Sequence, residues 1–409
     1  MKHTILEKTK TRTRYLANKH VHAQAIQKTD FSIIMGFMTN NKDDEKKLFE
    51  AVENGDYTLC KQLLEKGVSA NTVSPNNNWS VLHTAASRGF FKISELLLDH
   101  GADLDAQFQG PFGSRSTPLL VAAEEGRDGC VGVFLERGAD IECRDCFRNT
   151  PLHLAARHGY VHVVKALLAK KANRECLNEW LETPLMSAAK KGRDEIIPLL
   201  LEGVDDDDVK RMMEERAKSG RTIVHLAADE GHPNTVALLV QKYNANVNAK
   251  DADGRTPLHL ACGVLTLKPK FATVATLLGL GADNAKDDKL ILEMACQGNA
   301  SIVSLLITYG ANLEAMDSSK RTPLHHACIW NRVETARVLL KAGANANNTN
   351  YCLNETPLYE AAKRGFVELV KLLLEYGAKP DIPDYAGKTA RDNALKGGHT
   401  EIVELLTTN

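Results

Sequence analysis

Residues 150–173 read TPLHLAARHGYVHVVKALLAKKAN, and this pattern recurs along most of the 409-residue chain. Thr-Pro-Leu-His also begins at Thr256 and Thr322. Thr-Pro-Leu followed by a different residue begins at Thr117, Thr183 and Thr356. Most successive starts are 33 or 34 residues apart. Self-similarity at a fixed period in this range is the sequence signature of a tandem-repeat protein.

The residue types within one repeat predict two short helices. Thr150 is a preferred N-cap, and the proline after it suits the first position of a helix, where a missing N–H group costs nothing. Gly159 suits a left-handed cap at the end of that helix, and the apolar residues between Val163 and Leu168 follow helical spacing. One such unit cannot bury its apolar face alone, so neighbouring units must stack. We therefore predict an all-α repeat solenoid of stacked helix-turn-helix units joined by hairpin-like loops.

The recurring Thr-Pro-Leu-His, paired small residues, glycine and Gly-Ala-Asp or Gly-Ala-Asn closely resemble the ankyrin-repeat family. The resemblance implies about eleven units that cover residues 44–409, starting near Lys46, Ser80, Thr117, Thr150, Thr183, Thr222, Thr256, Leu290, Thr322, Thr356 and Thr389. The first and last units lack parts of the motif, as expected of capping repeats. Residues 1–43 form a separate basic arm, for which we expect disorder.

Three segments break the period. Four extra residues predict a longer loop at Gln107–Arg115, and six extra residues around Asp205–Arg216 predict one or two added helical turns. We interpret the acids Asp205–Asp208 themselves as a solvated loop, because consecutive aspartates lack the alternating ligands of a calcium loop. The third break, at 263–290, predicts a local change in curvature, and both a hinge and a rigid kink remain open.

The composition limits the class of protein. The chain has 51 Lys and Arg residues against 52 Asp and Glu residues, so no overall field favours nucleic acid or an acidic membrane. No apolar stretch approaches the roughly 20 residues of a membrane span. Nine cysteines without a secretory signal predict reduced thiols and a cytoplasmic location, with the nucleus also open. The seven basic side chains in the first 28 residues leave a transit peptide open as an alternative to a disordered arm.

Histidines and cysteines recur at positions that suit a structural role. A catalytic histidine would not be duplicated once per unit, as happens at His83, His153, His225, His259 and His325, and the resemblance gives this histidine a bond to the neighbouring loop. Cys262, Cys296 and Cys328 replace the second paired alanine and are predicted to be small buried core residues. The pair Cys143 and Cys146 lacks two further zinc ligands at suitable spacing. Because no phosphate loop, nucleophile elbow or acid pair occurs, we expect no enzyme, cofactor, metal or small-molecule substrate.

The resemblance also implies a binding surface. Ankyrin proteins bind partners on a concave face made of loop tips and of two variable residues that follow the paired alanines. The first cluster on that surface comprises Phe147, Arg157, His158, Trp180, Lys190 and Lys191. The second comprises Ile329, Trp330, Tyr351, Leu353, Lys363 and Arg364. Since aromatic and arginine residues dominate interface energetics, we predict a protein partner with an extended acidic segment and hydrophobic anchors. The alternative is that each tryptophan packs on a neighbouring loop.

Asn71 and Asn347 occupy the loop position that asparaginyl hydroxylases modify in ankyrin proteins. Each follows a leucine, Leu63 or Leu339, by eight residues, so the resemblance implies modification of the scaffold at these two sites.

The leading functional hypothesis is a non-catalytic scaffold or adaptor that binds another protein. A substrate-recognition subunit of a ubiquitin ligase is the alternative, and its recruiting segment would be expected in residues 1–43, since the repeats run to Asn409. Contact with nucleic acid through the basic arm is the weaker alternative, because seven basic residues support only salt-sensitive binding.

Overall fold

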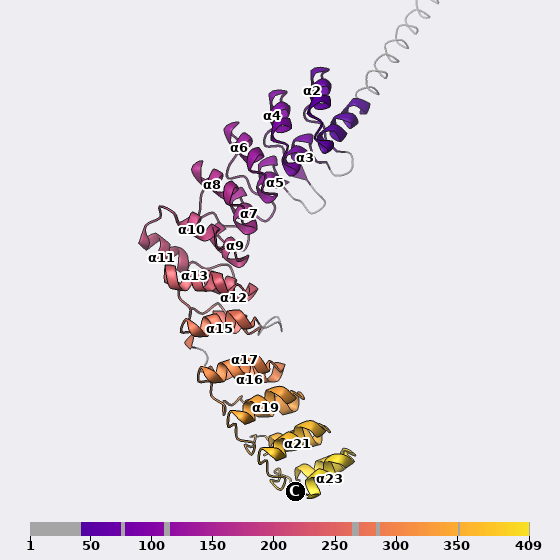
Figure 1. Cartoon of the computed structure of the whole chain (residues 1–409), viewed down its shortest axis with the longest axis vertical. Helices are drawn as coiled ribbons and strands as arrows, with labels where there is room; N and C mark the ends of the chain where they lie inside the picture. Colours follow the sequence, from indigo (N-terminus) through magenta and orange to yellow (C-terminus); the bar gives the residue numbers. More distant parts are fainter. Residues whose placement is uncertain are drawn as a thin grey trace, which may run out of the picture. The chain divides into compact units, whose positions relative to one another are not determined.

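The computed structural model describes residues 42–74, 78–109, 115–263, 270–283, 287–350 and 352–408, so the predicted arm lies almost entirely outside the described residues. The chain divides into two compact units. The N-terminal unit comprises residues 1–155 and 162–173, and the C-terminal unit comprises residues 156–161 and 174–409. Within each unit, pairs of short helices follow one another along the chain (Figure 1).

The first helix of most repeats begins directly after a Thr or Ser cap. The first helices of the second to eleventh repeats are α3 (Val81–Arg88), α5 (Pro118–Glu124), α7 (Pro151–His158), α9 (Pro184–Lys190), α12 (Ile223–Glu230), α14 (Pro257–Ala261), α16 (Asp288–Gln297), α18 (Pro323–Ile329), α20 (Pro357–Lys363) and α22 (Ala390–Lys396). Of these, α16 is capped by Asp287. A helix over residues 42–54 takes this place in the first repeat.

The second helix of each repeat carries the longer apolar stripe. These second helices are α2 (Tyr57–Glu65), α4 (Phe91–Asp99), α6 (Asp128–Glu136), α8 (Val161–Ala169), α10 (Ile196–Leu201), α13 (Pro233–Tyr243), α15 (Phe271–Gly279), α17 (Ala300–Thr308), α19 (Val333–Lys341), α21 (Val367–Glu375) and α23 (Thr400–Thr408). In the ranges that the structure describes, none of the helices has the length and apolar character needed to cross a membrane.

The helix ends follow from the residues that the sequence places there. The Thr117 hydroxyl accepts a hydrogen bond from the Leu120 amide at 3.3 Å, which satisfies one of the amides left over in the first helical turn. Gly159 and Gly138 adopt φ angles of 85°, in the left-handed region where a side chain would be strained. The expected Thr caps and glycine stops are therefore confirmed.

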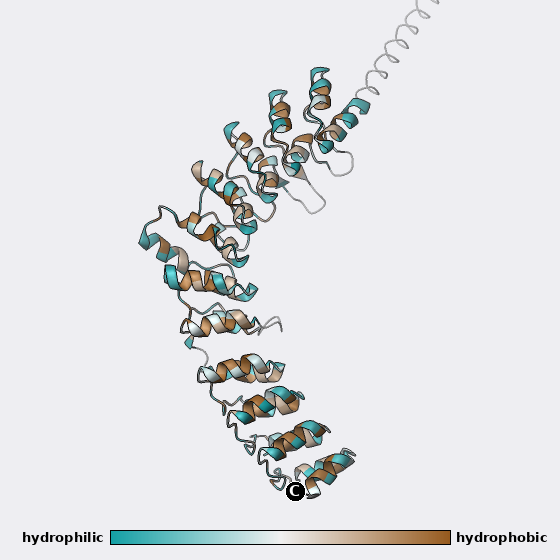
Figure 2. Cartoon of the chain, in the orientation of Figure 1, coloured by the Kyte–Doolittle hydropathy of each residue, from teal (hydrophilic) through white to brown (hydrophobic). Residues whose placement is uncertain are grey.

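The core lies between successive helix pairs. Ala227 and Ala228 on α12 have no exposed surface, and their small side chains allow α12 to approach the neighbouring first helices α9 and α14 closely. Phe134, Leu97 and Leu167 on second helices are also fully buried, and each such side chain contributes about 1.5–3 kcal/mol. Figure 2 shows apolar residues as bands along the helices, with hydrophilic residues at helix ends and loops. The fold class is an all-α repeat solenoid, as predicted.

The first break in the period contains the short antiparallel strands β1 (Phe108–Gln109) and β2 (Arg115–Ser116). Phe108 pairs with Ser116 across the ribbon. The Trp79 ring meets the Phe108 ring edge-on, with centroids 5.9 Å apart, which is a favourable aromatic geometry. This contact fastens the base of the longer loop to the N-terminal unit.

The second break contains an additional helix, α11 (Asp206–Glu214), which confirms the predicted helical turns. The interpretation of Asp205–Asp208 as a loop is wrong. Asp205 caps α11 by accepting from the Asp208 amide at 2.8 Å, and the next three aspartates form its first turn, where the helix macrodipole favours negative charge. The third break includes residues 264–269 and 284–286, outside the described ranges, so the change in curvature stays a prediction.

Candidate functional site

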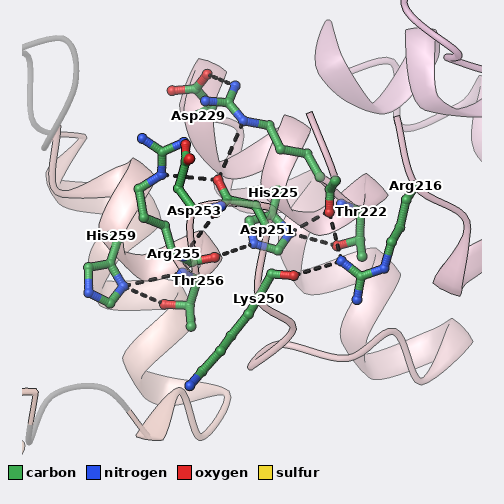
Figure 3. A network of polar contacts seen from close by, with 12 residues as sticks. Arg216, Thr222, His225, Asp229, Lys250, Asp251, Asp253, Arg255, Thr256 and His259 are labelled. Atoms are coloured by element: carbon green, nitrogen blue, oxygen red, sulfur yellow. Dashed lines mark hydrogen bonds and ion pairs between the residues drawn. The ribbon is translucent and has the colours of Figure 1, made fainter. Parts of the chain in front are cut away.

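The recurrent histidines tie a first helix to the loop of the next repeat. The Thr222 amide donates to His225 Nδ1 at 3.2 Å, so Nε2 carries the proton and donates to the Arg255 carbonyl oxygen at 2.9 Å (Figure 3). His325 makes the same pair of bonds in its own repeat. Burial lowers the pKa of both imidazoles, which keeps them neutral. Their role is therefore structural, as predicted.

A network of charged side chains joins the sixth and seventh repeats (Figure 3). The fully buried Asp251 carboxylate accepts from Arg255 Nε at 3.1 Å, and Arg221 lies 2.8 Å from Asp229. Burial raises the pKa of Asp251, but hydrogen bonds from the amide and guanidinium of Arg255 outweigh burial, and the pKa lies below its usual value. Arg216 donates to the Gly220 carbonyl oxygen at 2.7 Å and to the Lys250 carbonyl oxygen at 2.6 Å, so it joins the loops that precede the sixth and seventh repeats. These groups fasten two repeats together.

The first predicted cluster is divided between the two units. Phe147 is exposed at a loop tip of the N-terminal unit. In the C-terminal unit, Trp180 is 41% exposed and the Lys190 ammonium lies 5.9 Å from the centroid of its ring, within cation–π range. Arg157 is exposed at the end of α7, and the neighbouring His158 ring stacks on a tyrosine. The structure thus brings Trp180 and Lys190 together.

The two lysines of this cluster already have acidic partners. Lys190 Nζ lies 2.7 Å from a carboxylate oxygen of Glu182, whose side chain is only 7% exposed. Lys191 Nζ lies 3.4 Å from Glu230. A carboxylate at ion-pair distance cancels much of the potential of an ammonium group. The first cluster is therefore less positive than its lysines alone suggest.

The second predicted cluster has a larger apolar part. Trp330, the C-cap of α18, is 55% exposed, and Ile329 before it is half-buried. Leu353 is 50% exposed at the tip of the following loop. Tyr351 lies outside the described residues. Because α20 packs beside α18, the basic residues at the end of α20 lie near the end of α18 that carries Trp330.

These basic residues, Lys363 and Arg364, are also paired within the chain. Lys363 Nζ lies 3.0 Å from Glu355 and Arg364 forms an ion pair with Glu360, and both carboxylates are buried. The Lys363 ammonium also lies 5.8 Å from the centroid of the Tyr359 ring. The second cluster therefore offers exposed apolar surface and two cationic groups. The buried carboxylates of Glu355 and Glu360 neutralise much of the charge of these groups.

A regular charge pair escaped the sequence analysis. Among the described residues, the one just before a capping Thr forms an ion pair with the one eight positions later in the fifth, sixth and tenth repeats. The acid comes first in two of these pairs and the base comes first in the other, so the two charges always have opposite signs. The pairs are Glu182 with Lys190, Arg221 with Asp229, and Glu355 with Lys363. Opposite charges at this fixed spacing are visible in the sequence, but only the fold shows that the first helix brings them within reach.

The side chains of Asn71 and Asn347 form hydrogen bonds that join neighbouring loops. Asn71 donates to the Gly101 carbonyl oxygen at 3.0 Å and accepts from the Asp103 amide at 2.7 Å. Asn347 makes the equivalent bonds at 3.1 and 2.8 Å. Asn248 has the same arrangement, at 3.3 and 3.0 Å, which the sequence analysis did not single out. Modification of Asn71 and Asn347 stays a prediction.

The buried cysteines are packed thiols. Cys262 and Cys328 are fully buried, as predicted, and burial raises the pKa of both thiols. Cys296 is only half-buried, contrary to the prediction, because the buried pair in α16 is Met294 and Ala295, and Cys296 follows this pair as the half-buried Ile329 follows Cys328 in α18. The Cys143 sulfur lies 3.2 Å from the Thr117 hydroxyl, and burial raises the pKa of this thiol to about 12. Such a thiol is rarely ionised, as a metal ligand must be.

The comparison with protein families agrees with this geometry. A family model described as "Ankyrin repeats (3 copies)" matches residues 48–145, 119–212, 205–288, 266–350 and 345–409. The chain belongs to the ankyrin-repeat family. Ankyrin repeat domains are generally non-catalytic modules that bind other proteins, and the Thr caps and histidine bonds described above are the parts that hold such repeats together in this chain.

The relatives share the ankyrin repeats within much longer proteins. Human "Transient receptor potential cation channel subfamily A member 1" is 32% identical over 194 residues, covering 46% of this chain and 17% of the channel subunit. "E3 ubiquitin-protein ligase KEG" of Arabidopsis thaliana is 29% identical over 85% of this chain and 20% of the ligase. The chain thus spans about a fifth of these relatives. The crystal structure of the human ASB11 ankyrin repeat domain aligns with 57% of this chain and 97% of that domain, at 29% identity and a TM-score of 0.48.

Proposed function

We propose that the chain is a non-catalytic scaffold that binds another protein on the first-helix face of the C-terminal unit, meaning the loop tips and the ends of the first helices. The observation that carries the proposal is the exposed indole of Trp330 at the end of α18, 55% exposed beside the half-buried Ile329. Large aromatic side chains at this exposure supply much of the binding energy of protein interfaces when a partner covers them.

The neighbouring residues extend this anchor. Leu353 is 50% exposed at the next loop tip, and Lys363 and Arg364 lie at the end of the adjacent first helix. An extended segment lying across these repeats would place apolar side chains on Trp330 and Leu353. Acidic residues of the same segment would meet the two cationic groups.

Apolar contact contributes more than charge in this proposal. Because Lys363 and Arg364 already pair with buried carboxylates, an acidic partner gains less than it would from unpaired cations. We therefore expect binding that weakens only slightly between low and physiological salt, whereas a partner attracted mainly by charge would show a steep salt dependence.

The test compares two substitutions of exposed aromatic residues. The tagged protein captures partners from its own cells, and binding of an identified partner is then measured for Trp330→Ala and for Phe271→Ala. Phe271 is 51% exposed on the second helix α15, away from the first-helix face, and serves as the control. We expect Trp330→Ala to weaken binding at least tenfold and Phe271→Ala to leave it unchanged, with both proteins folded. Equal affinity for all three proteins would refute the proposed surface.

A second candidate function is substrate recognition in a ubiquitin ligase. The observation that favours it is the match of 85% of this chain to a plant protein named as a ubiquitin ligase. Captured complexes would be incubated with ubiquitin, activating enzyme and conjugating enzymes. Ubiquitin chains on the captured partner, lost with Trp330→Ala, support this candidate. Captured complexes without ligase activity argue for the simpler scaffold.

A further inference from the structure

The C-terminal unit contains a second candidate surface, built by the helix that interrupts the repeats. A hollow of about 970 Å³ lies between α11, the end of α10 and the end of α13. These elements are an inserted helix and two second helices, so the hollow is separate from the first-helix face. A volume of this size accommodates several side chains of a bound peptide.

The walls of the hollow are held in place. Met212 and Met213 are buried and anchor α11, which packs beside α13. On the solvent side, the Arg211 guanidinium lies 2.6 Å from Glu175, 2.9 Å from Asp208 and 3.0 Å from Glu215. Because one arginine links the inserted helix to the loop of the previous repeat, the hollow is largely formed before any partner arrives.

The floor and the rim of the hollow have different chemistry. Leu199, Val204 and Val209 line it as half-buried side chains, together with the buried Met213. This floor offers contact to an apolar side chain.

The rim is acidic. Glu202, Asp206, Asp207 and Glu214 line the hollow and are exposed. Two lysines, Lys210 and Lys242, also line it, so the acidic side chains outnumber the basic ones. Charges around an apolar pocket select partners of opposite sign and speed their association. A guest with arginine or lysine on both sides of an apolar residue would satisfy both the floor and the rim, whereas an acidic guest would be repelled.

We propose that this hollow binds a short basic segment of another protein, with one or two apolar side chains on the floor and flanking basic side chains at the rim. This inference does not depend on the proposed function of the first-helix face, because the two surfaces share no residue. A scaffold with both surfaces can hold two partners at once.

The test uses synthetic peptides as probes. A fluorescein-labelled peptide with two leucines flanked on each side by two arginines is titrated with the full chain, and binding is followed by fluorescence anisotropy at 150 mM salt. The comparison peptides replace the arginines by glutamates or the leucines by alanines. We expect the arginine–leucine peptide to bind at least tenfold more tightly than the glutamate peptide and about fivefold more tightly than the alanine peptide.

Matched charge reversals locate the binding site. Glu202→Lys with Glu214→Lys changes the rim, and neither carboxylate is part of the ion pairs that hold α11. Glu368→Lys with Glu375→Lys on α21 changes the net charge equally at exposed positions elsewhere. We expect the rim variant to lose at least tenfold in affinity and the control to keep it, with unchanged circular dichroism in both.

Four outcomes would overturn the proposal. Equal losses in both charge-reversal variants would mean nonspecific attraction. Equal binding of the leucine and alanine peptides would exclude the apolar floor. Binding that appears only after deletion of residues 1–41, or a dimer that the rim substitutions dissociate, would make the chain's own arm or a second copy the occupant in place of a partner.

Discussion

His325→Leu should destabilise the ninth repeat by an amount that depends on pH. The imidazole has no exposed surface; Nδ1 accepts from the Thr322 amide at 3.2 Å and Nε2–H donates to the Glu355 carbonyl oxygen at 3.1 Å. Leucine has a similar volume but cannot make either bond. Because the Thr322 amide loses its partner in a buried place, the expected loss at pH 7 is about 3 kcal/mol of unfolding free energy.

The pH dependence follows from the pKa of the same group. Burial lowers the pKa of His325 to about 4, although the hydrogen bond to Glu355 acts in the opposite direction. The unfolded chain has the ordinary value near 6.5 and therefore binds the proton first as the pH falls. Between pH 7 and pH 5 the native protein should lose about 2 kcal/mol through this residue alone. The leucine variant has no such loss, so the difference between the two proteins should shrink from about 3 to about 1 kcal/mol.

Urea unfolding at pH 7 and pH 5 measures this difference. Replacing Trp79 and Trp180 by phenylalanine leaves Trp330, in the same repeat as His325, as the single tryptophan reporter. Other buried histidines titrate in both proteins and cancel in the comparison. The exposed His162, changed to leucine, is the control for the loss of a histidine at the surface. A stability difference for His325→Leu that is equal at pH 7 and pH 5 would show that this imidazole is not held neutral by the fold.

Two further predictions concern the loops and the thiols. Gly220 and Gly254 have φ angles of 73° and 77°, but a Cβ at Gly220 would lie 2.6 Å from the Ala252 backbone nitrogen while Gly254 has open space. Gly254→Ala should therefore cost about 1 kcal/mol and Gly220→Ala about 3 kcal/mol or more in thermal unfolding, and equal costs would contradict the close approach of the two loops. In the native protein, a thiol reagent should modify the exposed Cys352 within minutes and the fully buried Cys328, whose thiol pKa is raised by burial, only on unfolding. Mass spectrometry of the labelled peptides checks the order, and early labelling of Cys328 would show that the repeat opens readily.

The sequence by itself determined the repeat and its helices, and the resemblance to the ankyrin-repeat family indicated the structural role of the recurrent histidines. Thr caps, prolines at the first helical position and left-handed glycines act through bonds within a few residues of each other, so their pattern can be read from the chain alone. The same local chemistry predicted the helical turns of α11. It also contained the signal for the start of α11, since Asp205 is a good N-cap, but four consecutive acids were interpreted as a loop.

The charge and the shape of the surfaces were decided by tertiary structure. The basic residues at Lys190, Lys363 and Arg364 have the composition of a positive patch, but the fold places buried carboxylates beneath them. Likewise, the hollow beside α11 needs three helices that are brought together only when the fifth and sixth repeats stack. The local sequence pattern specifies which residues form each helix. The electrostatic potential of a surface and the shape of a cavity depend instead on atoms that are close in space but far apart along the chain.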